Sequence, residues 1–150
     1  MNSKTRSVIF YLIILAISVI FPVPRNMNES FTCLVYDQAD SSYCSSATVT
    51  FEGRYNDYLV RKDRFDGTIS IHGLDAVSSD SIDCDLIVYK YAESVITSSD
   101  SGTSLSFHGT EKMDEFIISV RTAESADGAS NQFFITSEEM TIEKIHSKIG

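Results

Sequence analysis

The 150-residue chain contains no tryptophan and only two prolines, and its 12 basic residues are outnumbered by 21 acidic ones. The lack of tryptophan weakens the case for a carbohydrate-stacking platform, although seven tyrosines remain. The net charge of −9 at pH 7 disfavours nucleic acid as a partner, because an acidic surface repels phosphates. We therefore expect no nucleic-acid binding.

Signatures of catalysis are also missing. The chain has no G-x-S-x-G, S-x-x-K, H-E-x-x-H, P-loop or dinucleotide-binding pattern and no C-x-x-C pair. The acidic stretch that includes Asp83 and Asp85 does not fit a calcium-binding EF-hand loop. We predict neither a metal nor a cofactor and favour a non-enzymatic protein. The alternative is an exported hydrolase that assembles Asp and Glu residues with His72 or His108 across strands.

An apolar run opens the chain. Residues 8–23 carry no charge, and Lys4 and Arg6 precede them. This pattern predicts a membrane anchor over residues 1–24, with a cleaved signal segment and a buried core helix as alternatives. An anchored chain would be a single-pass protein of the cell membrane with its C-terminal domain outside, and a cleaved one would be secreted. The polar residues 25–30 predict a short linker.

Residues 31–150 predict a single extracytoplasmic β domain. Apolar and polar side chains alternate in several short segments, as is typical of strands with one buried face. Strand patterns or short apolar runs occur at residues 48–52, 68–72, 85–91, 104–108, 115–121 and 132–136. Glycines and Asp-Gly pairs between them favour turns. The fold class is therefore mainly β, with an antiparallel β-sandwich or sheet of six to seven strands.

The last residues predict a helix. Ser137 is a candidate N-cap, and an apolar stripe with helical spacing follows at Ile142, Ile145 and Ile149. We expect this C-terminal helix to pack against the sheet.

Residues 49–71 predict a hairpin with a candidate binding region at its turn. Val49 and Phe51 should share a buried face with Ile69 and Ile71. The connecting segment mixes cations with aromatic side chains, as binding loops do. We predict that an envelope component or a protein partner binds there, through Arg54, Tyr55, Tyr58 and Arg61.

The cysteines are odd in number: Cys33, Cys44 and Cys84. A disulfide between Cys33 and Cys44 would close a loop of about a dozen residues and contribute about 3 kcal/mol to stability. In that case Cys84 would be a buried free thiol. The sequence leaves the disulfide and its absence equally open.

Two parts of the chain resemble a known pattern. After the apolar run come Val49-Thr-Phe-Glu-Gly53, then Tyr58-Leu-Val-Arg61 and Asp63-Arg-Phe-Asp-Gly-Thr-Ile-Ser-Ile71. This arrangement resembles small membrane-anchored β-domain proteins of Gram-positive bacteria, to which no activity is assigned. The resemblance implies a bacterial origin and an extracytoplasmic location, and no functional residues carry over. We expect a membrane-tethered binding, sensing or structural module of the cell envelope.

Overall fold

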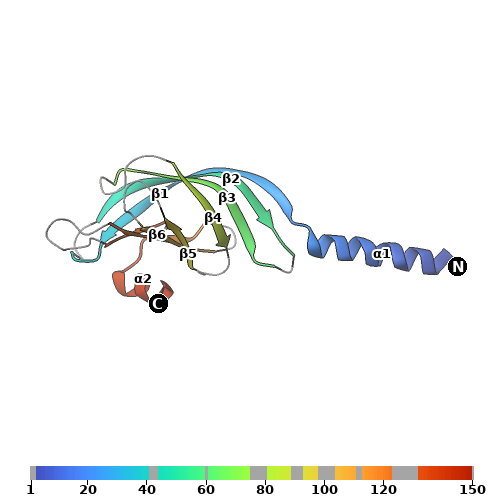
Figure 1. Cartoon of the computed structure of the whole chain (residues 1–150). Coiled ribbons are helices and arrows are strands. Elements are labelled where there is room, and N and C mark those ends of the chain that lie inside the picture. Colours follow the sequence, from blue (N-terminus) through green and yellow to red (C-terminus); the bar gives the residue numbers. More distant parts are fainter. Residues whose placement is uncertain are drawn as a thin grey trace.

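The computed structural model describes residues 3–40, 44–59, 61–74, 81–88, 93–97, 104–110, 113–122 and 132–149. Within these ranges, the chain forms a first helix, then eight strands, then a second helix (Figure 1). The helices are α1 (Ser3–Ile20) and α2 (Ile142–Ile149). The strands are β1 (Val23–Asp37), β2 (Cys44–Asp57), β3 (Asp63–His72), β4 (Ile82–Val88), β5 (Glu93–Thr97), β6 (Ser104–Gly109), β7 (Phe116–Arg121) and β8 (Gln132–Thr136).

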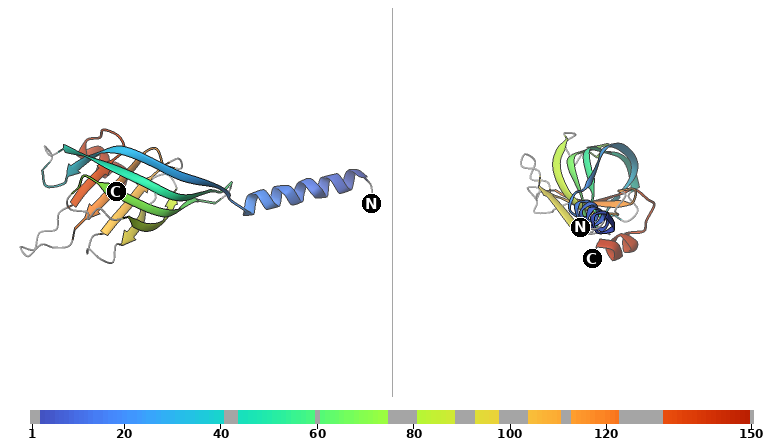
Figure 2. Two further views of the ribbon diagram at one scale, coloured as in Figure 1. Left: turned by 90° about the horizontal axis from the view of Figure 1, so that it is seen from above. Right: turned by 90° about the vertical axis from the view of Figure 1, so that its right-hand side faces the viewer.

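All eight strands belong to one antiparallel sheet with the order β4-β3-β2-β1-β8-β7-β6-β5. Strands that follow one another in the chain are paired neighbours, except β4 and β5, and the first strand pairs with the last. The sheet therefore curls into a nearly closed, barrel-like form whose two edges are β4 and β5 (Figure 2). The mainly β, antiparallel prediction is confirmed. The predicted six to seven strands are wrong, since the sheet has eight.

Two strands, β1 and β5, have no counterpart among the segments predicted from the sequence. Residues 25–30, predicted as a linker, lie inside β1 and pair with β2, from Arg25 opposite Tyr55 to Ser30 opposite Thr50. In this part of β1 only Met27 is buried. An alternating apolar pattern arises where one strand face is covered, so this half of β1 leaves almost no trace in the sequence.

Phenylalanine rings fill the interior of the curled sheet. The Phe51 ring of β2 lies edge-on to four others: its centroid is 5.2 Å from that of Phe116, 5.8 Å from that of Phe65, 5.9 Å from that of Phe107 and 6.0 Å from that of Phe31. Phe31 is partly buried, and the other four side chains are fully buried. Edge-to-face contacts suit the ring quadrupole and add to the stabilisation from apolar burial. These rings join β2 and β3 to β6 and β7 across the interior.

The predicted hairpin at residues 49–71 is confirmed. Val49 pairs with Ile71 and Phe51 pairs with Ile69, and all four side chains are buried. Further along the same pair of strands, Gly53 lies opposite Gly67. A Cβ atom on either glycine would overlap the backbone of the other strand, so only glycine permits this close approach.

The helix α2 covers the outer face of the sheet near β1, β7 and β8 (Figure 1). Ile145 is fully buried there with Tyr36, Ile117, Phe134 and Met140, and Ile142 and Ile149 pack against the same cluster. The predicted helix and its packing are confirmed, but its start is not. Thr141 accepts a hydrogen bond from the Lys144 N–H at 3.3 Å and is the N-cap. Ser137 instead bonds to the backbone of Phe116.

The helix α1 projects away from the sheet (Figure 2), and its apolar side chains, such as Phe10 and Leu12, are exposed. Within the described residues, neither helix combines the length and the apolar character that crossing a membrane requires. The apolar part of α1 starts only at Val8. From there to Ile20 the helix rises about 20 Å, whereas the hydrocarbon core is about 30 Å thick. This finding overturns the predicted anchor and, with it, the predicted single-pass location at the cell membrane.

Candidate functional site

The four residues predicted to bind a partner do not converge on one surface. Arg54 and Arg61 are exposed, Tyr58 is half-buried, and Tyr55 is only 1% exposed. Arg54 and Tyr55 are consecutive on β2, so their side chains point to opposite faces of the sheet. The ring of Tyr55 is therefore unavailable to a ligand, and a binding role for the two arginines stays a prediction.

Tyr55 instead belongs to a cluster that closes the β2–β3 connection. Its hydroxyl donates to Asp63 Oδ2 at 2.7 Å, and the backbone N–H of Tyr58 donates to Asp63 Oδ1 at 2.8 Å. The guanidinium of Arg25 lies 4.4 Å from the centre of the Tyr55 ring, at cation–π distance. Burial, reinforced by the hydrogen bond to Asp63, raises the pKa of Tyr55 well above its usual value. This cluster has a structural role.

The strand register keeps Cys33 and Cys44 apart. Cys33 lies opposite Ala47, and Cys44 lies opposite Tyr36, three residue pairs further along the ladder. Three pairs correspond to about 10 Å along a strand, whereas a disulfide needs Cα atoms about 4.4–6.8 Å apart. Cys33 is a buried free thiol whose Sγ donates to the Phe31 carbonyl at 3.6 Å. The structure therefore does not form the disulfide between Cys33 and Cys44.

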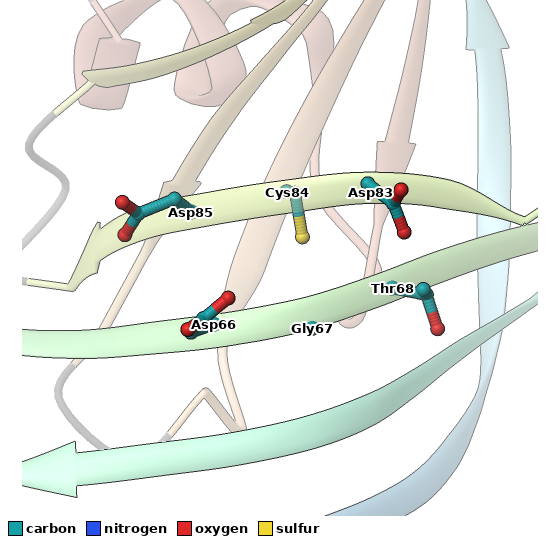
Figure 3. A pocket seen from close by; sticks show the side chains of 6 residues that line it. All are labelled: Asp66, Gly67, Thr68, Asp83, Cys84 and Asp85. Carbon is teal, nitrogen blue, oxygen red and sulfur yellow. The ribbon is translucent and has the colours of Figure 1, made fainter.

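An open pocket of about 470 Å³ lies over β3 and β4 (Figure 3). Its lining consists of two facing three-residue segments, Asp66-Gly67-Thr68 and Asp83-Cys84-Asp85. The antiparallel register places Asp66 opposite Asp85, Gly67 opposite Cys84 and Thr68 opposite Asp83.

Side-chain alternation decides which groups a ligand would meet in this pocket. The three aspartates are exposed and Thr68 is half-buried, whereas Cys84 is 8% exposed. The carboxylates therefore stand on the outer face of the sheet. Position 67, opposite Cys84, belongs to the inner face, where a Cβ atom would meet Phe65 and the backbone of β2. Thr68 donates its hydroxyl to the Glu52 carbonyl at 3.3 Å, which ties this corner of the pocket to β2.

The pocket is strongly negative. Asp66 and Asp85 are like charges directly opposite each other on paired strands, an arrangement that is destabilising by up to about 1 kcal/mol. Arg64 forms a two-bond ion pair with Asp85, and its hydrogen bonds lower the pKa of that carboxyl. Both partners are about half exposed, so the pair adds little stability.

Cys84 offers no reactive thiolate to this pocket. Burial, followed by the charges of Asp85, Asp66 and Asp83, raises the pKa of the Cys84 thiol to about 12. A thiol with such a pKa stays protonated near neutral pH and is a weak nucleophile.

Neither histidine considered for a hydrolase lines the pocket. His72 is exposed at the end of β3, and His108 is buried on β6. Among the described residues, no group of three His, Cys, Asp or Glu side chains is arranged to hold a metal ion. The pocket can therefore attract positive charge, but it brings together no described nucleophile and base.

In the sequence, Asp83 and Asp85 drew attention only as part of an acidic stretch that does not fit an EF-hand loop. The strand there was predicted to start at residue 85, whereas β4 begins at Ile82. Once the strand includes both residues, their spacing of two puts them on one face. The alternation of Asp83 and Asp85 with Ile82, Cys84 and Leu86 was therefore the signal in the sequence that could have placed both aspartates on one strand face.

Comparisons with protein-family models, with curated proteins and with solved structures found no significant match to this chain. The resemblance to small β-domain proteins of Gram-positive bacteria is neither confirmed nor refuted by this result.

Proposed function

We propose that this chain is a non-enzymatic binding module, and that the pocket over β3 and β4 binds a cationic group of a protein partner. The observation that carries the proposal is the register that sets Asp66 opposite Asp85 and places Asp83 beside them around one pocket. A bound ammonium or guanidinium group would interact with all three carboxylates.

Electrostatics supports a cationic ligand. Arg64 neutralises Asp85, which leaves Asp66 and Asp83 as the uncompensated negative charges that the pocket offers. A bound cation would be attracted to these two carboxylates. The net charge of −9 would steer cationic partners towards the molecule.

The hydrolase alternative draws no support from this pocket. General acid–base chemistry needs a group whose pKa lies near the working pH and which can reach the reacting atom. Here the thiol of Cys84 is held protonated, and neither His72 nor His108 is among the lining residues. The resemblance to Gram-positive proteins contributes no residue to either alternative.

A titration with spermidine, followed by backbone NMR, tests the proposal. Spermidine supplies ammonium groups without a peptide backbone. We expect chemical-shift changes centred on Asp66, Thr68, Asp83 and Asp85. A variant that carries Asp66→Asn, Asp83→Asn and Asp85→Asn together should lose them. The matched control changes three exposed acids near α2, Glu138→Gln, Glu139→Gln and Glu143→Gln, and alters the net charge equally.

The control variant should bind spermidine at the pocket as the unaltered protein does. Shifts spread evenly over all acidic residues, or equal losses in the two triple variants, would mean that only the overall charge attracts the ligand. Either result would refute the pocket as a specific site.

A further inference from the structure

The strand β1 is accompanied by β8 for only part of its length. β8 pairs with Leu34–Asp37 and ends at Thr136, whereas β1 already begins at Val23. Among the described residues, residues 24–30 pair with β2 alone, and all of them except Met27 are exposed. Figure 2 shows this part of β1 running beyond the end of β8 toward α1. On the side away from β2, β1 therefore has a free edge over residues 24–30.

The backbone groups that face this free edge follow from the hydrogen bonds to β8. Just after β1, the Gln38 N–H donates to the Gln132 carbonyl of β8 at 3.1 Å. Alternate residues of a strand direct their N–H and C=O groups to the same side. The register between β1 and β2 is continuous, so this alternation extends to the start of β1. Asn26, Asn28 and Ser30 therefore direct their backbone groups to the free edge.

A hydrogen bond on the other side of β2 supports this assignment. Glu52 lies opposite Asn28, and its carbonyl accepts a hydrogen bond from the Thr68 hydroxyl of β3. The Glu52 carbonyl thus points away from Asn28, as in a residue pair that exchanges no hydrogen bonds. The N–H and C=O groups of Asn28 consequently point away from β2 as well.

The side chains along this edge are complementary to their own copy. Arg25, Met27 and Glu29 share one face of β1, with the cation and the anion on either side of Met27. If a second β1 runs antiparallel with the two Met27 residues opposite each other, Arg25 of each copy lies opposite Glu29 of the other. Opposite charges across a ladder are stabilising. A ladder centred on Arg25 or on Glu29 would instead oppose like charges, so charge selects one register.

We propose that the protein dimerises through the free edge of β1, in a two-fold symmetric antiparallel ladder of residues 24–30 centred on Met27. The backbones of Asn26, Asn28 and Ser30 supply the hydrogen bonds. Pro24, which has no N–H, stands at the end of the ladder, where only its carbonyl accepts a bond. The two-fold axis closes the assembly, so no third copy is added. This inference is independent of the acidic pocket, which lies over β3 and β4.

The ion pairs that define the register use charges that are otherwise uncommitted. Among the described residues, neither Arg25 nor Glu29 forms an ion pair within its own copy. Arg25 lies over the ring of Tyr55, which holds its guanidinium near the ladder. At the end of the ladder the partner's α1 must turn aside, and Phe21 and Pro22, which belong to neither α1 nor β1, allow the chain to bend there.

Charge reversal tests the register. Arg25→Glu and Glu29→Arg each replace two pairs of opposite charge by two pairs of like charge, so each variant alone should dimerise about tenfold more weakly. An equimolar mixture of the two variants is complementary again, and so is the double variant with itself. Both should dimerise about as strongly as the unaltered protein. The double variant keeps the test valid if either single variant fails to fold.

The dimer is measured with the full-length protein by analytical ultracentrifugation. Salt at about 0.15 M screens the repulsion between two copies that each carry a net charge of −9. The matched controls are Arg121→Glu and Glu143→Arg, which change the net charge equally at exposed positions outside β1. Each control should change the dimerisation constant less than about twofold.

Amide hydrogen exchange provides a second readout of the same ladder. As the protein concentration rises, exchange at Asn26, Asn28 and Ser30 should slow. Exchange at Met27 and Glu29, whose N–H groups point toward β2, should not change. A protein that stays monomeric at all concentrations would overturn the inference. So would a dimer that the Arg25 and Glu29 variants do not weaken, which would place the contact elsewhere, for example on the exposed apolar side chains of α1.

Discussion

The hydroxyl of Tyr36 on β1 accepts a buried 3.3 Å hydrogen bond from the backbone N–H of Met140, 104 positions later in the chain. Tyr36 and Met140 belong to the apolar cluster under α2, together with Ile145. This bond fastens the segment before α2 to the first strand of the sheet.

Removing that acceptor should destabilise the protein. In Tyr36→Phe the ring stays, but the buried N–H of Met140 loses its partner, which costs about 1–3 kcal/mol. Urea unfolding at neutral pH measures the loss. Tyr11→Phe on the exposed surface of α1 is the control and should change the free energy of unfolding by less than about 0.5 kcal/mol. Equal effects of the two changes would contradict a structural role for this bond.

Phe51→Ala should be the most damaging single truncation in the interior. The ring is fully buried and makes edge-on contacts with Phe31, Phe65, Phe107 and Phe116. Removing a ring of this kind costs about 3–5 kcal/mol, a large part of the total stability of a small domain. Thermal and urea unfolding would record it. Arg61→Ala, on the exposed β2–β3 connection, should stay within about 0.5 kcal/mol of the unaltered protein.

Gly67→Ala should be destabilising although it adds only one methyl group. The new Cβ would overlap the carbonyl of Glu52 and the Cα of Gly53, which are backbone atoms and cannot move aside independently. Overpacking of this kind costs about 1–3 kcal/mol. The exposed Ser46→Ala on β2 provides the comparison in the same unfolding assay. A neutral Gly67→Ala would show that β2 and β3 are further apart than described.

Ser94→Ala should selectively loosen the seam of the sheet, where its edges β4 and β5 meet without pairing as a ladder. The change removes the two hydrogen bonds that the Ser94 hydroxyl forms with the Ile87 backbone, and because Ile87 is partly exposed, water replaces them at a cost of about 1 kcal/mol. Amide exchange at Ile87 should accelerate, while exchange within the β2–β3 hairpin stays unchanged. Ser94→Thr keeps the hydroxyl and should restore slow exchange. A uniform acceleration over all strands would instead point to global destabilisation.

The protein should lose stability in mildly alkaline solution. Burial raises the pKa of the Cys33 thiol to about 11, and burial with nearby aspartates raises that of Cys84 to about 12. In the unfolded chain both thiols ionise near pH 9, whereas in the folded protein they stay protonated at this pH. The stabilisation is therefore complete below about pH 8.5 and declines as the pH rises, by up to about 1.4 kcal/mol per pH unit for each thiol.

Unfolding with reductant present, between pH 8 and pH 10, measures this decline. Cys33→Ala and Cys84→Ala should each flatten it, and the double variant should flatten it further. If the double variant declined as steeply as the unaltered protein, groups other than these two thiols would cause the alkaline loss.

Local patterns in the sequence were sufficient to predict a helix or strand where one face of that element is covered. Val49 and Phe51 alternate with polar residues because they point inward, and their predicted pairing with Ile71 and Ile69 is the one observed. The stripe on α2 was equally informative, since Ile145 meets the sheet and its neighbours on the helix meet solvent.

The features that escaped prediction depend on contacts between distant segments. The first half of β1 has little buried surface, so nothing in residues 25–30 distinguishes a strand from a linker. The pocket over β3 and β4 exists because the register sets Asp66 opposite Asp85, and no local pattern determines which residues face each other. One of the two tyrosines of the predicted binding region, Tyr55, is held inside by Asp63 and Arg25.

The pairing of the first strand with the last has a consequence for the order in which the protein folds. Strands β1 to β4 form a meander of neighbours in sequence, and so do β5 to β8, so each half can form from contacts over short distances along the chain. The ladder between β1 and β8, from Leu34–Thr136 to Asp37–Phe133, joins the halves only after β8 has been synthesised. Such distant contacts slow folding, because a long loop must close before they form. Until that step, the nascent chain displays β1 as an open edge, and the charged and proline residues at its start, Pro24, Arg25 and Glu29, discourage the wrong strand from pairing with it.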